Sequence, residues 1–378
     1  MKKSFTAGAK IRKKDVSLGM KIICLTRHLK MGGLERQLAG LAVALKTLGN
    51  EVQVVTYHSG DFFDGILAEH RIPHRVIPKG HLTVVSIFRL LRHFKAEKPD
   101  LVIAFGASAG RKACAVKRLW PHFRLIVSER NANPHQTLYD AYRMRIFRQA
   151  DYILCNSYRQ ADHLRTCFPA LAGKISTIVN FVDADAFQPA AEPPRNPVFT
   201  LVTTARVCAR KNVLRYIEAV RILREQGREL KVLWYGKSHE SRYLRCCEKA
   251  IRKAGLQDCF FLLPGQRDVA ALYQKADAFC LPSLYEGTSN SIAEAQCCGL
   301  PVLCSDVSDN ARYVCPGISG FLFRPLDPAS IAEAIGRAMD MGETVLREMG
   351  RQGRTFVQEA LSPDRFRESY RQLIETIV

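Results

Sequence analysis

The architecture of this chain is indicated most clearly by one stretch, Pro282-Ser283-Leu284-Tyr285-Glu286-Gly287-Thr288-Ser289-Asn290-Ser291-Ile292-Ala293-Glu294. It follows the apolar run 276–281, which is typical of a buried strand, and the proline ends that strand. Thr288, Ser289 and Asn290 are residue types that cap the start of helices, and the residues after them favour a helix. The stretch therefore predicts a strand, a short glycine-containing loop and a helix. The free N–H groups of the first helical turn favour phosphate or another anion.

Two carboxylates flank this predicted anion site. Glu286 lies in the loop, and Glu294 lies one turn inside the helix. Acidic groups on either side of a diphosphate suit the hydroxyl groups of a nucleotide-sugar, which lie on both sides of its diphosphate. The alternative is an ordinary capped helix with two solvated glutamates.

The first half of the chain alternates between strand and helix patterns. A buried strand at 20–26 is followed by a turn with Gly32 and Gly33, a helix at 34–48 and a strand at 51–57. This order predicts a parallel sheet covered by helices. Neither early strand is followed by Gly-x-Gly-x-x-Gly, which argues against a dinucleotide oxidoreductase. The alternation continues with helices expected at 62–69, 84–95, 109–118, 138–149 and 158–167, and with strands at 75–77, 101–105, 125–128, 152–155 and 174–179.

The segment 189–197 contains four prolines and has the composition of a linker. The alternation restarts with a strand at 199–204 and a helix at 213–226. Arg206 and Lys211 lie between them, where two cations can hold a diphosphate by charge-assisted hydrogen bonds; the alternative is a solvated basic loop. Further strands are expected at 230–235, 259–263, 301–304 and 320–323, and helices at 242–254, 328–339 and 365–377.

Composition narrows the class of protein. A chain of 378 residues with 47% hydrophobic residues is long enough for two domains. No apolar run is long enough for a membrane-spanning helix, and the basic tail 1–19 lacks the apolar block of a signal peptide. The 13 cysteines include no Cys-x2-Cys pair, so we expect reduced core cysteines and no structural metal.

The positive charge is uneven. The net charge is +20, and residues 1–190 contain 30 Lys and Arg against 14 Asp and Glu, whereas residues 191–378 contain 26 against 22. Segments 86–95, 111–120 and 142–148 are basic and amphipathic. They are suited to contact with an anionic membrane surface, or alternatively they are helices packed on the sheet with solvated arginines.

Several motifs resemble family 4 of the retaining glycosyltransferases. Glu286 and Glu294 match the Glu-x7-Glu motif, and Gly299-Leu300-Pro301-Val302 matches its C-terminal flank. Arg206 and Lys211 are similar to the family's Arg-x4-Lys, and Asn180-Phe181-Val182-Asp183 resembles an Asn-Gly-Val-Asp signature, with Phe181 where glycine is usual. The resemblance implies the α/β GT-B fold, in which two Rossmann-like parallel-sheet domains face a central cleft. It implies an acceptor-side domain at 20–188, a nucleotide-sugar domain at 198–360 and a helix at 361–378 that crosses back to the first domain.

The resemblance also implies roles for individual residues. Glu286, Arg206 and Lys211 are expected to be catalytic. Donor binding is expected of Gly32, Gly33, Gly265, Gly287, Thr288, Ser289, Asn290 and Glu294. Many relatives have a histidine soon after the strand expected at 125–128; here Glu129, Arg130 and His135 are the candidates for contact with the sugar or the acceptor.

The function that the resemblance implies is retaining, metal-independent transfer of a hexose, without a cofactor, from a nucleotide-sugar to a glycan or lipid-linked acceptor. The basic first half favours cell-envelope polysaccharide or lipopolysaccharide synthesis in the cytoplasm, at the inner face of the membrane. One alternative is a GT-B nucleotide-sugar epimerase. The other is a basic nucleic-acid-binding protein, but no RNA-binding motif or zinc finger supports it, and no nucleic-acid partner is expected.

Overall fold

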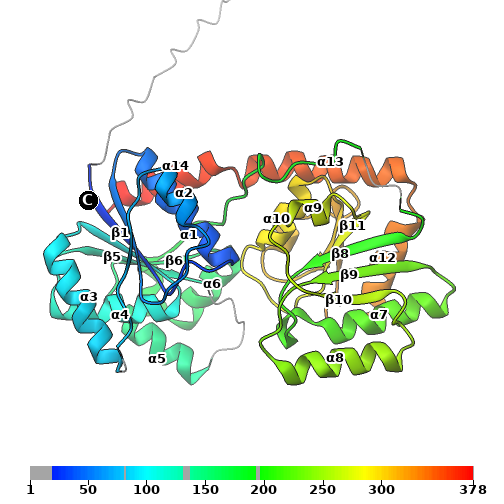
Figure 1. The fold of residues 1–378 in the computed structure, drawn as a ribbon, viewed down its shortest axis with the longest axis horizontal. Helices are drawn as coiled ribbons and strands as arrows, with labels where there is room; N and C mark the ends of the chain where they lie inside the picture. The colour runs from blue at the N-terminus through cyan, green and yellow to red at the C-terminus, as the bar shows by residue number, and fades with distance from the viewer. Residues whose placement is uncertain (1–18, 81, 131–136, 193–195, 378) are drawn as a thin grey trace, which may run out of the picture.

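The computed structural model describes residues 19–80, 82–130, 137–192 and 196–377, and these form two α/β domains (Figure 1). The first domain contains a sheet of order β3-β2-β1-β4-β5-β6-β7, in which all neighbouring strands are parallel. Its strands are β1 Lys21–Thr26, β2 Glu51–Thr56, β3 His74–Val76, β4 Leu101–Phe105, β5 Arg124–Glu129, β6 Tyr152–Cys155 and β7 Ile175–Thr177.

Helices cover both faces of this sheet. One face packs on α1, α2 and the C-terminal helix α14, and the other packs on α3 to α6. These helices are α1 Gly33–Thr47, α2 Asp64–Glu69, α3 Thr83–Glu97, α4 Ala107–Leu119, α5 Leu138–Phe147 and α6 Tyr158–Cys167, with a 3-10 turn at Pro169–Lys174. Both faces are therefore apolar, as the continuous apolar strands predict.

The second domain repeats the plan with the order β10-β9-β8-β11-β12-β13. Its strands are β8 Phe199–Thr204, β9 Leu230–Tyr235, β10 Phe260–Leu263, β11 Ala278–Leu281, β12 Val302–Ser305 and β13 Gly320–Phe323. Its helices are α7 Val213–Glu225, α8 Ser241–Lys253, α9 Ala270–Tyr273, α10 Asn290–Cys297, α11 Asn310–Tyr313, α12 Pro328–Asp340 and α13 Glu343–Ala360. The strand order reverses between β8 and β11, and the crevice at such a switch point is where open α/β sheets bind ligands.

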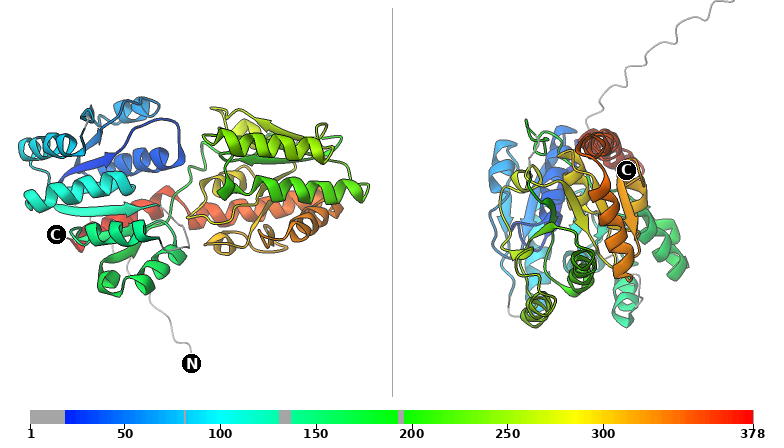
Figure 2. Two further views of the ribbon diagram at one scale, coloured as in Figure 1. Left: turned by 90° about the horizontal axis from the view of Figure 1, so that it is seen from below. Right: turned by 90° about the vertical axis from the view of Figure 1, so that its right-hand side faces the viewer.

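The chain returns to the first domain through α14, Pro363–Glu375, whose Phe366, Tyr370 and Ile374 are buried in the first domain's core (Figures 1 and 2). Phe181 lies 4.8 Å from the Phe366 ring, centroid to centroid. A Cβ on Gly40 of α1 would lie 2.1 Å from the Phe181 ring. The aromatic side chain at the family's usual glycine position is therefore accommodated by a glycine on the helix that faces it.

The prediction of two parallel-sheet α/β domains is confirmed. Helix α13 was not predicted: it contains Gly350 and Gly353, which lower helix propensity. A Cβ at Gly350 would lie 1.8 Å from the carbonyl oxygen of Gly299, so α13 needs this glycine to approach the turn after α10. The tail 1–18 and linker residues 193–195 lie outside the described residues.

Candidate active site

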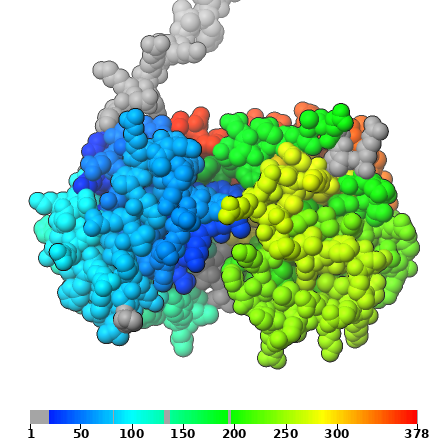
Figure 3. All heavy atoms as spheres, in the orientation of Figure 1, coloured from blue at the N-terminus to red at the C-terminus, as the bar shows by residue number. Residues whose placement is uncertain are grey.

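A cavity of about 680 Å³ lies between the two domains, within the size range of small-molecule sites. Figure 3 shows the hollow between them. Its lining includes all the residues predicted to be catalytic or donor-binding, and also Arg130: Gly32, Gly33, Arg130, Arg206, Lys211, Gly265, Glu286, Gly287, Thr288, Ser289, Asn290 and Glu294. The structure thus brings together residues that are far apart in the sequence.

Glu286 is the centre of a buried charge cluster in the second domain. Lys211 Nζ lies 2.5 Å from Glu286 Oε1, and Arg210 Nη1 lies 3.1 Å from Oε2. Burial alone would raise the pKa of Glu286, but the charges of Lys211 and Arg210 outweigh it and lower the pKa to about 2. Glu286 is therefore a carboxylate throughout the neutral range and cannot serve as a proton donor there.

The loop that carries Lys211 is fixed to the loop that carries Glu286. Asn212 adopts a left-handed conformation with φ 62°, and its side-chain amide donates to the carbonyls of Pro282 (3.0 Å) and Pro325 (2.7 Å). The N–H of Leu284 donates to the Arg210 carbonyl at 2.9 Å. These bonds hold the Lys211 ammonium beside Glu286 before any ligand binds.

Arg206 completes the set of cations. It is exposed on the cavity wall just after β8, and it makes no ion pair with any residue in the described part of the chain. Helix α10 begins beside these cations: Ser289 is its N-cap, but no side chain caps the first turn. A free guanidinium, a lysine and an uncapped helix start are suited to binding an anion with several oxygen atoms.

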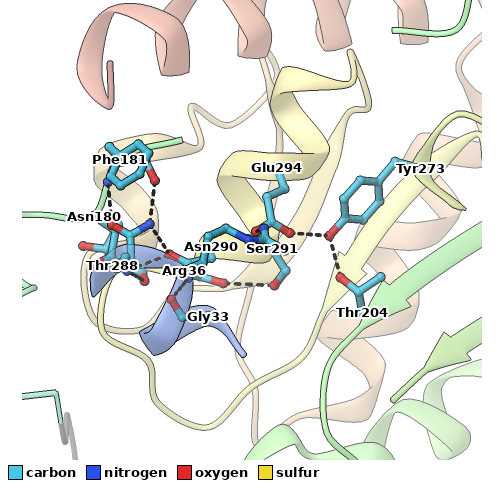
Figure 4. Close-up of polar contacts among 12 residues, drawn as sticks. Gly33, Arg36, Asn180, Phe181, Thr204, Tyr273, Thr288, Asn290, Ser291 and Glu294 are labelled. Carbon is cyan, nitrogen blue, oxygen red and sulfur yellow. Dashed lines mark hydrogen bonds and ion pairs between the residues drawn. The ribbon is translucent and has the colours of Figure 1, made fainter. Parts of the chain in front are cut away.

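Glu294 lies within α10 and has partners from both domains (Figure 4). Its Oε1 accepts a hydrogen bond from Arg36 on α1, and its Oε2 accepts one from the Tyr273 hydroxyl at 3.2 Å. The Tyr273 hydroxyl in turn lies 2.5 Å from Thr204 Oγ1. This carboxylate, predicted to bind the donor, is thus held by a tyrosine of its own domain and an arginine of the other.

The start of α10 is joined to the first domain by polar contacts between side chains and backbone. Asn290 Nδ2 donates to the Gly33 carbonyl at 3.1 Å, and Asn180 Nδ2 donates to the Thr288 carbonyl at 3.0 Å (Figure 4). The Thr288 hydroxyl donates to the Asn156 carbonyl. A Cβ on Gly33 would lie 2.5 Å from Asn290 Nδ2. The absence of a side chain at position 33 therefore leaves room for Asn290 of the other domain.

Gly287 and Gly265 differ in how closely they are packed. A Cβ on Gly287 would lie 2.7 Å from Asn156 Oδ1, so this glycine also permits the approach of the first domain. A Cβ on Gly265 would meet only the Cα of Gly236, at 3.8 Å. Gly265 therefore lines the cavity without being required by protein packing.

The candidates near the acceptor side have three different outcomes. Glu129 is fully buried, does not line this cavity, and has its Oε2 2.9 Å from Arg143 Nε, so its carboxylate neutralises a buried arginine. Its contact with sugar or acceptor stays a prediction. Arg130 lines the cavity and donates to Asn180 Oδ1, with its guanidinium 4.5 Å from the Phe105 ring centroid. His135 lies outside the described residues.

No group of three or more His, Cys, Asp or Glu that could hold a metal ion occurs within the described ranges. Asp183 and Asp185, which are two residues apart, form a local turn in which Asp183 Oδ1 accepts the Asp185 N–H at 3.0 Å.

Among the helices of the described segments, none is both long and apolar enough to cross a membrane.

The side chains that pair with Glu286 and Glu294 were not all predicted from the sequence. Arg210 is adjacent to Lys211 in the same basic run, and that adjacency was the available signal. Arg36 and Tyr273 gave no comparable signal, because they lie 258 and 21 residues from Glu294 in the chain.

Two facing α/β domains with this cavity define the GT-B class of glycosyltransferases. Family models agree: the model described as Glycosyltransferase Family 4 matches residues 31–186, and the model described as Glycosyl transferases group 1 matches residues 185–356. The chain belongs to family 4 of the GT-B glycosyltransferases.

Individual relatives are more distant. The chain is 29% identical over 222 residues to an MMP alpha-(1->4)-mannosyltransferase of Mycolicibacterium hassiacum, covering 58% of this chain and 52% of that protein. It is 31% identical over 183 residues to a UDP-Gal:alpha-D-GlcNAc-diphosphoundecaprenol alpha-1,3-galactosyltransferase of Escherichia coli, covering 44% and 46%. The chain thus matches about half the length of these relatives.

Most of the chain also superposes on solved structures of the same fold. Anabaena Alr3699/HepE in complex with UDP-glucose superposes with a TM-score of 0.84 at 18% identity, covering 94% of this chain and all of that one. At this identity the likeness establishes the fold alone.

Proposed function

We propose that this protein is a retaining glycosyltransferase that moves a hexose from a nucleotide-sugar to an acceptor hydroxyl. One observation carries the proposal: a single cavity holds Arg206, Lys211 and the uncapped start of α10, with Glu286 and Glu294 on either side. The E. coli relative is named for UDP-Gal and the Anabaena structure is a complex with UDP-glucose, so related folds bind donors of this chemical class.

In the proposed reaction the bond between the sugar C1 and the diphosphate oxygen breaks, and its electron pair leaves with the diphosphate. The acceptor oxygen forms a new bond to C1 on the same face, and its proton passes to the departing phosphate oxygen. Arg206, Lys211 and the N–H groups at the start of α10 stabilise the negative charge that develops on the leaving group. No side-chain nucleophile and no metal ion is assigned.

The two glutamates differ in role. Glu286 is held ionised by Lys211 and Arg210, so it accepts hydrogen bonds from the hydroxyls of the donor sugar. Glu294 accepts hydrogen bonds from the ribose hydroxyls, and the Tyr273 hydroxyl orients its carboxylate for this purpose. Because Arg36 occupies one oxygen of Glu294, ribose binding requires that Arg36 share or release that carboxylate.

The proposed acceptor is a glycan or a lipid-linked glycan of the cell envelope, as in polysaccharide or lipopolysaccharide synthesis. The E. coli relative is named for a diphosphoundecaprenol-linked sugar as acceptor. The first domain supports contact with an anionic membrane because α3 and α5 expose large apolar side chains, with Phe88 60%, Tyr142 58% and Leu138 93% exposed. Arg92 and Arg145 on the same two helices provide positive charge.

A panel of nucleotide-sugars tests the proposed activity. The expected outcome is slow release of nucleoside diphosphate and free sugar from one donor, with the sugar product in the donor's anomeric configuration by NMR. Conversion of the intact donor into another nucleotide-sugar would identify an epimerase instead.

A vesicle sedimentation assay tests the proposed membrane contact. We expect the wild-type protein to sediment with phosphatidylglycerol vesicles and the double variant Phe88→Ser/Leu138→Ser to remain in the supernatant. Equal sedimentation of the double variant would contradict the proposed contact.

A further inference from the structure

A second group of positive charges lies in the first domain, away from the predicted donor residues. Arg27 follows β1, Lys79 comes shortly after β3, and Arg111 and Lys112 are on the second turn of α4. Backbone bonds align the loops of adjacent strands: the His58 N–H donates to the Arg27 carbonyl at 3.0 Å, and the Lys79 N–H donates to the Tyr57 carbonyl at 3.1 Å. The group therefore lies along the carboxyl ends of neighbouring parallel strands, which is the ligand-binding edge of an α/β sheet.

Lys112 is the buried member of this group. Its side chain is only 7% exposed, its Nζ lies 4.2 Å from the Tyr57 ring centroid, and it donates to Ser108 Oγ at 3.2 Å. Burial, together with the charges of Lys79, Arg111 and Arg27, lowers the pKa of Lys112 to about 8. These cations thus lie close enough to repel one another.

No carboxylate neutralises this group. Across the described ranges, Arg27, Lys79, Arg111 and Lys112 form no ion pair, and outside those ranges the sequence contains a single acidic residue, Asp15. A buried ammonium held only by a hydroxyl and an aromatic ring lacks the counter-ion that buried charges normally have. Elsewhere the same domain does pair its buried cations, as the Arg143–Glu129 ion pair shows.

We propose that these four residues form an acceptor subsite that binds a phosphate or diphosphate ester, so that the acceptor of this enzyme is itself phosphorylated. The proposal rests on the proposed glycosyltransferase function and specifies its acceptor. Arginine forks and lysine ammonium groups are the side chains best suited to phosphate oxygens, and a partly buried site strengthens each such bond.

The four cations lie near the donor cavity, so an acceptor bound to them by its phosphate could extend to the donor sugar. Arg27 begins the loop that ends at Gly32 and Gly33 on the wall of the cavity. Five residues span at most about 18 Å, so the Cα atom of Gly32 on the cavity wall lies within that distance of the Cα atom of Arg27. His28, in the same loop, lies 3.2 Å from Glu35, which is near enough to Arg206 to feel its charge. The subsite and the donor site therefore border the same loop.

Binding of inorganic phosphate, followed by 31P NMR line broadening, tests the subsite. The titration uses the full chain carrying Arg206→Met and Lys211→Met, so that the donor site does not contribute. We expect this background to bind phosphate, Lys112→Met to weaken binding at least tenfold, and Lys112→Arg to retain it. Lys98→Met, which removes an exposed lysine at the end of α3, is the matched control. Thermal unfolding of each variant checks that it is folded.

Unchanged phosphate binding in Lys112→Met, or an equal loss in Lys98→Met, would overturn the subsite. Two further probes identify the source of the phosphate: glycerol 3-phosphate in solution, and phosphatidic acid in phosphatidylcholine vesicles. Dependence on Lys112 for either one supports the subsite, and dependence for neither overturns it. Failure of the donor assignment would appear separately, as nucleoside diphosphate binding that Arg206→Met/Lys211→Met does not weaken.

Discussion

Arg36 on α1 of the first domain forms an ion pair with Glu294 on α10 of the second, and it also stacks 5.4 Å from the Phe187 ring centroid at the junction of the domains. This contact joins the predicted ribose-binding carboxylate to the opposite domain. It therefore links the binding of the nucleotide to the separation of the two domains.

Replacing Arg36 with Met should shift the protein toward a more open arrangement in the absence of nucleotide. A half-buried ion pair contributes about 1 kcal/mol, which corresponds to roughly a fivefold change in the equilibrium between closed and open forms. Small-angle X-ray scattering should show a larger radius of gyration. Arg118→Met, at an exposed position on α4, should leave the radius unchanged; an unaltered radius for Arg36→Met would mean that the pair does not hold the domains together.

Gly33→Ala should weaken closure without unfolding the first domain, because the added Cβ would lie 2.5 Å from Asn290 Nδ2. The added methyl group must displace the Asn290 side chain, whose amide otherwise donates to the Gly33 carbonyl at 3.1 Å. The measurement is again the radius of gyration, with Gly173→Ala as the control, since its Cβ would meet no atom within 4 Å. Adding Asn290→Ala should restore closure to Gly33→Ala, and a failure to restore it would place the effect elsewhere.

The alternation of strands and helices was predictable because the central strands of each sheet are buried on both faces and most helices have one apolar face. The strand at Leu101–Phe105 and the helix at Tyr158–Cys167 were predicted to the residue. Helix α13 was missed because Gly350 and Gly353 lower its helix propensity, whereas Gly350 is required by packing against Gly299, which local propensity does not reveal.

The site was predictable in part, for a related reason. Glu286, Glu294, Arg206 and Lys211 form a recognisable spacing within one domain. The partners that the first domain supplies depend on how two separately folded sheets face each other. Glu129 became a candidate because it follows the strand after which many relatives have a histidine. Its ion pair with Arg143 depends on how α5 packs on the sheet, which the sequence does not reveal.

The charge cluster around Glu286 should make part of the stability depend on pH. Its pKa is lowered to about 2, below the ordinary value of 4.5, so its contribution is fully present above pH 4.5 and is lost as the pH falls toward 2. That contribution is on the order of 3 kcal/mol. Urea unfolding should show a constant stability difference between wild type and Glu286→Gln from pH 8 to 5, and a shrinking difference below pH 4.5. A difference that grows on acidification would contradict the assigned pairing.

The central claim is that Lys211 and its neighbours bind the diphosphate of a nucleotide-sugar. Lys211→Met should reduce donor hydrolysis by about two to three orders of magnitude while leaving the fold intact, as loss of a group that stabilises the transition state does. Because Lys211 is also paired with Glu286, thermal unfolding without ligand must accompany the assay.

The most direct measurement is a thermal-shift panel of nucleotide-sugars on wild type and Lys211→Met. A ligand that binds only the folded protein raises the melting temperature according to its occupancy. We expect at least one nucleoside diphosphate-sugar to raise the melting temperature of the wild type, and Lys211→Met to lose most of that increase. If no nucleotide-sugar stabilises the wild type, or if the variant is stabilised equally, the assignment of the cavity is contradicted.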